Sequence, residues 1–255
     1  MNIEKFQTLS QTQAHTKTSQ KYSLIPTSRV ISVLQDHGWH PAKVQEARAK
    51  EGNRGFQKHI VRLRQESGDL RVGDSFPEIV LINSHMGSSS FQLMLGMFRL
   101  VCSNGMVVGD TFEDYRIRHV GYTDEAVEKA LQSLVYHAPR AIESVNTFKG
   151  IELSQPERLA YAQSVIELVK GEDETYSIEP RDMLSVRRYD DAKNDLWTTF
   201  NVAQENVIRG GVRKRGTSYG QRRRTGAINS IDKNVTLNRA LWTLTEKMAE
   251  LRASH

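Results

Sequence analysis

A run of basic residues near the C-terminus offers the clearest chemistry in this sequence. Residues 209–224 read RGGVRKRGTSYGQRRR and hold seven cations, four glycines, one tyrosine and no acid. The formal net charge of the 255-residue chain is +5, so the other residues together carry −2 and the basic character is local. Like charges gather where a polyanion neutralises them or where the segment is solvated and mobile. The run therefore indicates either an arm that contacts nucleic acid or a charged linker.

The run contains the groups that hold a phosphate backbone. Each lysine or arginine that contacts a phosphate releases counterions, glycines let the chain follow the strand, and Tyr219 offers a ring for base stacking. We therefore expect a nucleic-acid-binding arm rather than a disordered linker. The cations expected to clamp phosphates are Arg209, Arg213, Lys214, Arg215, Arg222, Arg223 and Arg224.

A second basic surface is predicted on a strand at residues 58–64, which read KHIVRLR. Side chains alternate between the two faces of a strand, so Val61 and Leu63 face the core. The opposite face carries cations that could line a groove for a nucleic-acid backbone. The alternative is an exposed strand whose long side chains cover apolar neighbours. The cations of this face are Lys58, Arg62 and Arg64.

Two further groups of polar residues have a functional and a structural interpretation. The loop at residues 83–90, NSHMGSSS, contains Asn83 and His85. Its amides and hydroxyls could cradle a phosphate, or it could simply connect two strands. On a predicted helix, Gln204 and Glu205 follow Asn201 by three and four residues and share its side of the helix. They could contact bases or phosphates, or form a buried polar network that locks the helix to the sheet.

The sequence predicts no catalytic residues, no metal site and no cofactor. It lacks a phosphate-binding Gly-x4-Gly-Lys loop, a His-Glu-x-x-His zinc helix and a Gly-x-Ser-x-Gly elbow. Acidic residues at 172–174 and 190–191 form solvated loops or, together with His85, a site for a divalent cation. The second interpretation leaves a metal-dependent nuclease open as an alternative.

The pattern of elements predicts an α+β fold in which a curved antiparallel sheet packs on helices and the C-terminal half is mostly helical. A polar leader (1–20) precedes a sheet core (21–150) and a helical region (151–255) with an exposed arm at 209–226. For residues 43–54 we expect a surface helix or a loop. Helices are expected at 27–37, 123–145, 154–171, 194–209 and 235–251, and strands at 58–64, 79–82, 91–102 and 106–108, the last two joined by an Asn104-Gly105 turn.

Composition points to a cytoplasmic protein with no membrane partner. No apolar run approaches the length of about 18 residues that a membrane span needs. The N-terminus has no apolar signal-peptide core. A single cysteine, Cys102, excludes an internal disulfide and fits a reducing compartment.

Three blocks of the chain resemble a known family. They are NSHMGS through FRLVCSNG (83–105), LWTTFNVAQENVIRGG (196–211) and LNRALW (237–242). Together they resemble the phage/plasmid-like protein family, a domain of unknown function found on plasmids and in prophages. The resemblance extends from about residue 22 to the C-terminus and implies a mobile genetic element, but no catalytic residues.

The order of elements also resembles that of single-strand annealing proteins of the RecT and Redβ kind. No sequence motif is shared in this case. That resemblance implies binding of a strand in a basic groove between a sheet and a helix, and assembly into rings or filaments. We therefore expect a nucleic-acid-binding protein that binds or anneals single-stranded DNA in recombination or in plasmid or phage establishment. The alternatives are a protein-binding inhibitor of a host defence system and the nuclease. A host protein as partner and a homo-oligomer stay open.

Overall fold

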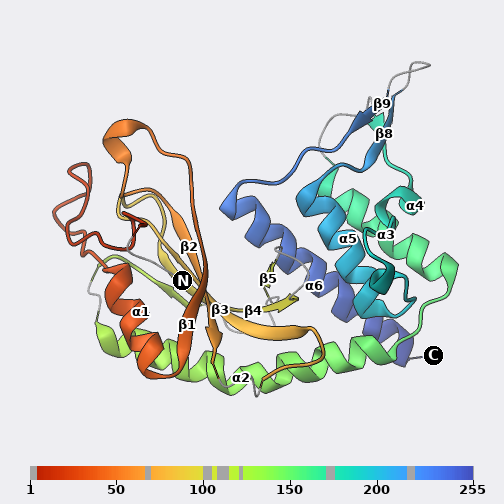
Figure 1. The fold of residues 1–255 in the computed structure, drawn as a ribbon, viewed down its shortest axis with the longest axis horizontal. Coiled ribbons are helices and arrows are strands. Elements are labelled where there is room, and N and C mark those ends of the chain that lie inside the picture. Colours follow the sequence, from red (N-terminus) through yellow and green to blue (C-terminus); the bar gives the residue numbers. More distant parts are fainter. Residues whose placement is uncertain are drawn as a thin grey trace. The chain divides into compact units, whose positions relative to one another are not determined.

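The structure is a computed structural model that describes residues 5–66, 70–99, 105–107, 115–120, 123–170, 176–216 and 222–254. The chain forms two compact units, whose elements are labelled in Figure 1. Unit 1 comprises residues 1–101 and 110–142, and unit 2 comprises residues 102–109 and 143–255. Unit 1 is built on an antiparallel sheet and unit 2 is mostly helical. The predicted α+β class with a mostly helical C-terminal half is confirmed.

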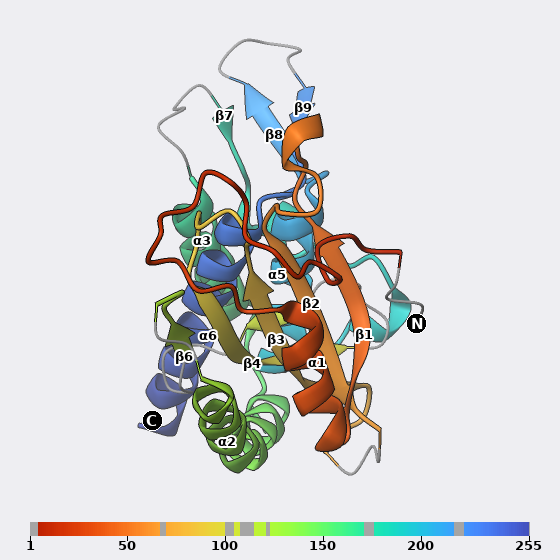
Figure 2. The ribbon, with the colours of Figure 1, turned by 90° about the vertical axis from the view of Figure 1, so that its left-hand side faces the viewer.

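The sheet of unit 1 consists of β1 (Trp39–Glu46), β2 (His59–Gln65), β3 (Ser75–Asn83), β4 (Phe91–Arg99) and β6 (Tyr115–Ile117). The strands are antiparallel in the order β1-β2-β3-β4, and β6 pairs with β4 (Figure 2). Every side chain of the central strand β3 is buried, so both faces of the sheet are covered there. The predicted strands at 58–64 and 79–82 are confirmed, and the predicted turn at Asn104 lies outside the described residues.

The first helix, α1 (Thr27–Asp36), packs against β1 and buries Val30, Ile31 and Leu34. It begins where the sequence predicts, but no threonine or serine side chain caps it. Pro26 is the N-cap residue, and the hydroxyl of Thr27 instead lies in the core, 2.8 Å from Nε2 of His59. The first helical residue is therefore used to tie the helix to the sheet.

The expectation of a surface helix or a loop for residues 43–54 is wrong up to Glu46, because β1 continues to that residue. Among the described strands, β1 forms one edge of the sheet and pairs with β2 alone. Its register shifts between Pro41 and Lys43, and proline is tolerated at an edge or a bulge because it cannot donate a ladder hydrogen bond. Charged residues such as Lys43 also suit an edge strand, since they discourage pairing with another sheet.

The helices of unit 2 pack around a cluster of aromatic rings. The ring centroids of Phe148, Trp197 and Phe200 lie 5.4, 6.3 and 6.4 Å from that of Trp242. Ser154 and Glu157 form a capping box at the start of the helix predicted at 154–171, in which the glutamate accepts hydrogen bonds from the serine N–H and hydroxyl. The helices are α2 (Asp124–Gly150), which also contributes to unit 1, α3 (Gln155–Val169), α4 (Pro180–Met183), α5 (Leu196–Arg209) and α6 (Ile231–Ala253).

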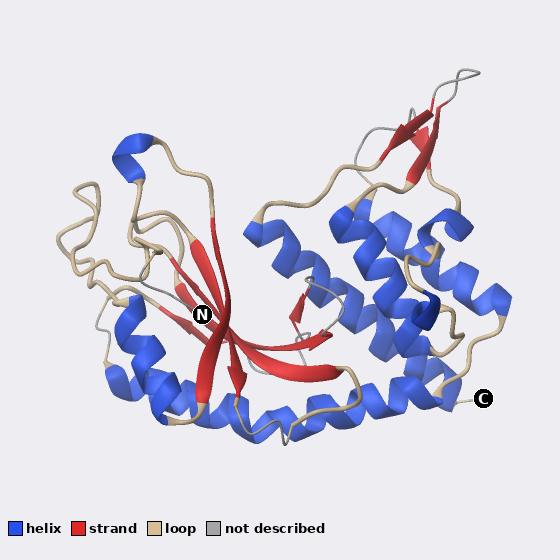
Figure 3. Ribbon diagram, viewed as in Figure 1, coloured by secondary structure: helices blue, strands red, loops and turns tan. Residues whose placement is uncertain are grey.

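Unit 2 also contains a small antiparallel sheet of β7 (Tyr176–Ser177), β8 (Arg213–Gly216) and β9 (Arg222–Arg224) in that order. Figure 3 shows these strands beyond the ends of the helices of the same unit. Strand β5 (Gly105–Val107) lies beside α6, and single 3-10 turns occur at Glu51–Asn53 and Tyr189–Asp191. In the part of the chain that the structure describes, no helix has the length and apolar character to cross a membrane.

Candidate nucleic-acid interface

The basic run forms a β-hairpin, which the sequence does not predict. β8 and β9 are antiparallel, and each cross-strand pair between them consists of two cations. Like charges placed opposite one another destabilise a sheet, by roughly 0.2–1 kcal/mol per pair. A polyanion bound to the hairpin would remove this repulsion. The pairs are Arg213 with Arg224, Lys214 with Arg223, and Arg215 with Arg222.

Among the described residues, the surroundings compensate little of the charge of Arg213, Arg215 and Arg224. The side chain of Arg213 is exposed and has no hydrogen bond or ion pair to any residue that the structure describes. Nη1 of Arg215 lies 3.5 Å from Oε1 of Glu179, a long ion pair between two well-exposed side chains. Nη1 of Arg224 donates to the carbonyl oxygen of Gly211 at 2.7 Å, which orients the guanidinium without cancelling its charge. Strand alternation places Arg213 and Arg215 on the same face.

Two glycines set the point at which the hairpin leaves α5. Gly210 and Gly211 have φ values of +68° and +84°, in the left-handed region that glycine tolerates best. A Cβ atom on Gly210 would lie 2.5 Å from backbone atoms of Gly226, so a larger residue does not fit. Backbone hydrogen bonds from Gly211 to Thr225 (2.8 Å) and from Thr225 to Val212 (2.9 Å) close the base of the hairpin. Gly210 and Gly211 therefore fix the backbone conformation at the base of the hairpin, where the sequence suggested flexibility.

Arg209 is held at the base of the hairpin by a buried acid. Its Nη1 lies 3.0 Å from Oε1 of Glu205, whose carboxylate also accepts hydrogen bonds from Arg188. Arg188 in turn pairs with the buried Asp191 at 3.2 Å. Removal of one partner from a buried ion pair is strongly destabilising, so this network fixes the last turn of α5. A phosphate contact by Arg209 stays a prediction.

The other polar residues of α5 also lie inside unit 2. Asn201 is buried and donates to the carbonyl oxygen of Trp197 at 2.6 Å. Gln204 is buried and donates to Oδ1 of Asn238 on α6 at 2.9 Å. Asn201, Gln204 and Glu205 are therefore all buried and hydrogen-bonded inside unit 2, which favours the structural interpretation, and Gln204 ties α5 to α6.

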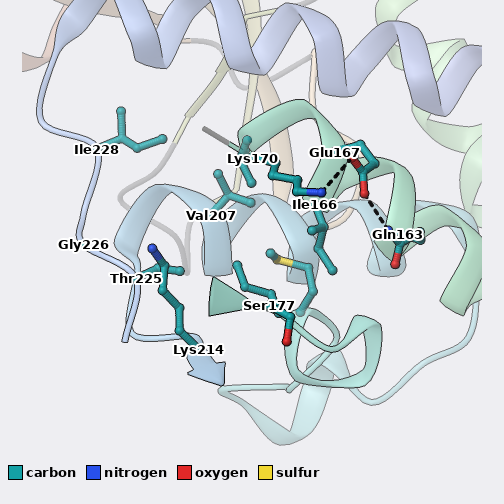
Figure 4. Close-up of a pocket in the computed structure, with 13 residues that line it drawn as sticks. Gln163, Ile166, Glu167, Lys170, Ser177, Val207, Lys214, Thr225, Gly226 and Ile228 are labelled. Carbon is teal, nitrogen blue, oxygen red and sulfur yellow. Dashed lines mark hydrogen bonds and ion pairs between the residues drawn. The ribbon is translucent and has the colours of Figure 1, made fainter. Parts of the chain in front are cut away.

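A pocket of about 680 Å³ lies beside the base of the hairpin (Figure 4). Two lysines line it, Lys214 from β8 and Lys170, which follows α3 and lies 3.9 Å from the carboxylate of Glu167. This volume is within the usual range of sites for small ligands. Apolar walls suit a planar ring, and the lysines suit an attached anion. The apolar residues are Ile166, Val169, Ile178, Met183, Val207 and Ile228.

The cations of β2 do not form the open basic face that the sequence predicts. Arg62 is buried, and its Nε donates to Oε2 of Glu78 at 2.5 Å. Arg64 donates to Oε1 of the same carboxylate at 2.8 Å. Their guanidinium carbons also lie 3.5 and 3.7 Å from the ring centroids of Phe98 and Phe76. The single buried carboxylate of Glu78 therefore offsets one of these two positive charges. Because Arg62 is also buried, the expectation of an open phosphate-lining groove here is corrected.

Lys58 is among the residues that the structure describes, whereas Tyr219 is not. Lys58 immediately precedes β2, is partly buried and interacts with a residue of the protein. Its contact with nucleic acid stays a prediction. Tyr219, the acidic residues at 172–174 and the tip of the hairpin lie outside the described residues.

Asn83 and His85 lie in a buried network that ties the N-terminal segment to the sheet. Nδ2 of Asn83 donates to the carbonyl oxygen of Ile25 (2.9 Å) and to Oγ1 of Thr27 (3.0 Å). His85 Nε2 donates to the carbonyl oxygen of Thr8 at 2.8 Å. Burial lowers the pKa of His85, and it lowers the pKa of the neighbouring His59 to about 4, so both rings are neutral near pH 7.

The geometry gives the nuclease alternative no assembled metal site in the described part of the chain. There, no group of three or more His, Cys, Asp or Glu side chains could hold a metal ion. Asp191 is buried beside Arg188, and His85 has no exposed surface.

Sequence reasoning missed the pocket beside the hairpin. Its lining residues come from α3, β7, α4, α5, β8 and the segment before α6. In the sequence, each lining residue has the pattern of an ordinary core or surface position. Only the closing of the hairpin base onto α5 brings them together, so no short motif could have indicated the site.

Comparison with known proteins assigns a family. Residues 14–242 match the family described as Domain of unknown function (DUF932). The chain belongs to this family. It is 37% identical over 235 residues to the UPF0380 protein YafZ of Escherichia coli strain K12, an alignment that covers 92% of this chain and 85% of that protein. The UPF0380 protein YfjQ of the same strain matches with the same identity and coverage. No solved structure matches this DUF932 chain.

Proposed function

We propose that this protein binds nucleic acid through the β8–β9 hairpin and prefers single-stranded DNA. The observation that carries the proposal is the register of the hairpin, in which cation faces cation at each of its three pairs. The three strands of this sheet are short, and this register weakens the pairing of β8 with β9. Phosphates between the arginines would turn the repulsion into attraction.

The shape of the hairpin suits a nucleic-acid backbone. Two-stranded ribbons are among the elements that enter nucleic-acid grooves or follow a strand. Arg213 is exposed and unpaired among the described residues, so it can meet a phosphate without first breaking an ion pair. Arg215 would give up only a long, exposed pair with Glu179, and such pairs are worth at most about 1 kcal/mol.

The pocket beside the hairpin supports the preference for a single strand. Lys214 belongs both to the hairpin and to the pocket lining, so a strand held by β8 runs past the pocket. Bases of a single strand can leave their stack and enter an apolar pocket, whereas bases in a duplex are stacked and paired. A base between Val207 and Ile228 would therefore add affinity that a duplex cannot gain.

We further propose that this binding serves recombination or the establishment of a plasmid or phage. The resemblance to the phage/plasmid-like proteins supports this setting. Single-strand annealing is the activity that would follow from binding of two complementary strands, and it requires no catalytic residue.

Fluorescence anisotropy of the purified full-length protein tests the proposal. Labelled single-stranded DNA, the same sequence as a duplex, and single-stranded RNA are titrated at several salt concentrations. We expect salt-sensitive binding that is tightest for single-stranded DNA. Equal affinity for strand and duplex would remove the proposed role of the pocket, and absence of binding at low salt would remove the proposal itself.

A further inference from the structure

Unit 1 contains a second, smaller pocket of about 230 Å³ that the hairpin does not use. It lies where the loop after β3 meets the residues after β6 and the N-terminal segment. The described lining residues include no aspartate and no glutamate. They are Ser19, Tyr22, Gly87, Ser89, Ser90, Arg118, His119 and Val120.

Two buried polar atoms of this pocket have no hydrogen-bond partner among the described residues. They are Oγ of Ser89 and Nε2 of His119. A buried polar atom without a partner costs roughly 1–3 kcal/mol, and native proteins leave few of them. The Ser89 backbone lies close enough to the ring to favour its protonated form, but it makes no hydrogen bond to Nε2. The two atoms together indicate a place where a ligand completes the hydrogen bonding.

The histidine ring is fixed in place by its other contacts. Nδ1 of His119 donates to the carbonyl oxygen of Ser23 at 3.2 Å. The ring stacks on Tyr22 with centroids 4.6 Å apart and an interplanar angle of 18°. The hydroxyl of Tyr22 donates in turn to the carbonyl oxygen of Ser84 at 3.0 Å. Nε2 is therefore the only ring nitrogen left for a ligand.

The charge of the pocket is positive. Arg118 is exposed and forms no hydrogen bond or ion pair with any described residue. Serine hydroxyls and a guanidinium are donors to oxyanions, and arginine matches the oxygens of a phosphate with two parallel hydrogen bonds. Gly87, with φ +69°, keeps the loop free of a side chain at this point. The donors and the absence of a carboxylate in the described lining select for an anion.

We propose that this pocket binds a phosphate group, held by Arg118, Ser89 and His119. Since Nδ1 already donates to Ser23, Nε2 of the neutral ring can only accept a hydrogen bond. It therefore accepts from a P–OH group, or it takes up a proton when a fully ionised anion binds. In the second case affinity rises as pH falls, because binding takes up a proton at Nε2. The proposal is independent of the hairpin, and the phosphate comes either from free inorganic phosphate or from the 5′ end of a nucleic-acid strand.

Burial lowers the pKa of free His119 from its ordinary value of 6.5, so the ring of the empty site is neutral at pH 7.5. An anion beside Nε2 raises that pKa. Consider an anion whose own charge does not change with pH. Its affinity should be low above the pKa that His119 has in the complex, and it should increase as pH falls through that pKa. Two other titratable groups lie near the ring. Burial raises the pKa of Tyr22 to about 12, so Tyr22 does not titrate in this range. Burial lowers the pKa of His85, which interacts electrostatically with His119, and His85 is therefore neutral near pH 7.

The test uses sulfate as a probe because its charge does not change between pH 6 and pH 8. Sulfate is titrated into the full-length protein by calorimetry, with chloride replacing it at constant ionic strength in the reference. We expect saturable binding of one sulfate that tightens at least fivefold from pH 8 to pH 6. Arg118→Gln and Ser89→Ala should each weaken it about tenfold. His119→Gln should remove the pH dependence. Lys21→Gln is the matched control, because it removes an exposed cation next to Tyr22 and should change nothing.

Two oligonucleotides distinguish the sources of the phosphate. A strand with a 5′-phosphate that displaces sulfate, while its 5′-hydroxyl twin does not, identifies a strand end as the ligand. Displacement by inorganic phosphate alone identifies the free anion. Both results support the site. Absence of sulfate binding, or binding that Arg118→Gln and Ser89→Ala leave unchanged, overturns it. Replacement of Arg222, Arg223 and Arg224 by alanine should leave sulfate binding intact, so failure of the hairpin proposal is separately visible.

Discussion

Replacement of Arg222, Arg223 and Arg224 by alanine tests the hairpin most sharply. The hairpin carries six cations in β8 and β9, and the variant removes the three that belong to β9. For a single strand the slope of log affinity against log salt is about −0.7 per phosphate contact. If all six cations contact phosphates, the wild-type slope is about −4 and that of the variant about −2. Between 50 and 200 mM salt, affinity should then fall about 300-fold for the wild type but only about 20-fold for the variant.

The assay is anisotropy of labelled single-stranded DNA at four or more salt concentrations, with wild type and variant side by side. Lys50, Lys129 and Lys193 provide a matched control, because they are exposed, unpaired among the described residues and distant in sequence from the hairpin. Their triple alanine variant has the same net charge as the β9 variant. The reasoning is refuted if both triple variants show the same slope, because net charge rather than the hairpin would then govern binding.

The β9 variant has a second consequence that binding alone cannot show. Alanine in β9 removes the cation-to-cation pairs, so the free energy of unfolding of the unbound protein should stay constant or increase slightly. Each relieved pair contributes roughly 0.2–1 kcal/mol. A urea titration of the variant measures this. A clear loss of stability would mean that the arginines stabilise the fold, and the argument from repulsion would fail.

Three further predictions concern other parts of the molecule. Glu78→Gln should lower the free energy of unfolding in urea by about 3 kcal/mol, because it leaves two arginines beside an uncharged amide. Since burial lowers the pKa of His59 to about 4, the unfolded chain binds a proton there below pH 6.5 that the folded chain does not. Stability should therefore decline as pH falls from 6.5 towards 4, by up to about 3 kcal/mol more in the wild type than in His59→Gln. Ile228→Trp, which fills the pocket beside the hairpin, should weaken binding of single-stranded DNA several-fold more than binding of duplex; equal losses would speak against a base in the pocket.

Residues whose local pattern decides their structure could be predicted from the sequence. Alternating and continuous apolar runs located β2 and β3, and the capping box at Ser154 located the start of α3. The concentration of cations at residues 209–224 likewise indicates the candidate interface without knowledge of distant contacts. In these cases the signal is a periodicity or a cap that acts over a few neighbouring residues.

Features that depend on distant partners could not be predicted. Arg62 and Arg64 read as exposed cations because Glu78, their partner, lies on the next strand and looks like an isolated acid in an apolar run. The hairpin at β8 and β9 has no alternating apolar pattern, since its strands consist of cations and glycine. The strands β8 and β9 meet where Gly210 lies close to Gly226. These two glycines are 16 positions apart, so no local pattern indicates the contact.

Cross-linking of a bound strand to the protein tests the central claim most directly. Single-stranded DNA with photoreactive thymidine analogues is bound to the full-length protein at low salt and irradiated, and the linked peptides are identified by mass spectrometry. The account predicts that cross-links concentrate in residues 209–228, at the hairpin and the pocket beside it, and that the β9 variant loses them. Saturable binding with cross-links confined to other parts of the chain would contradict the account.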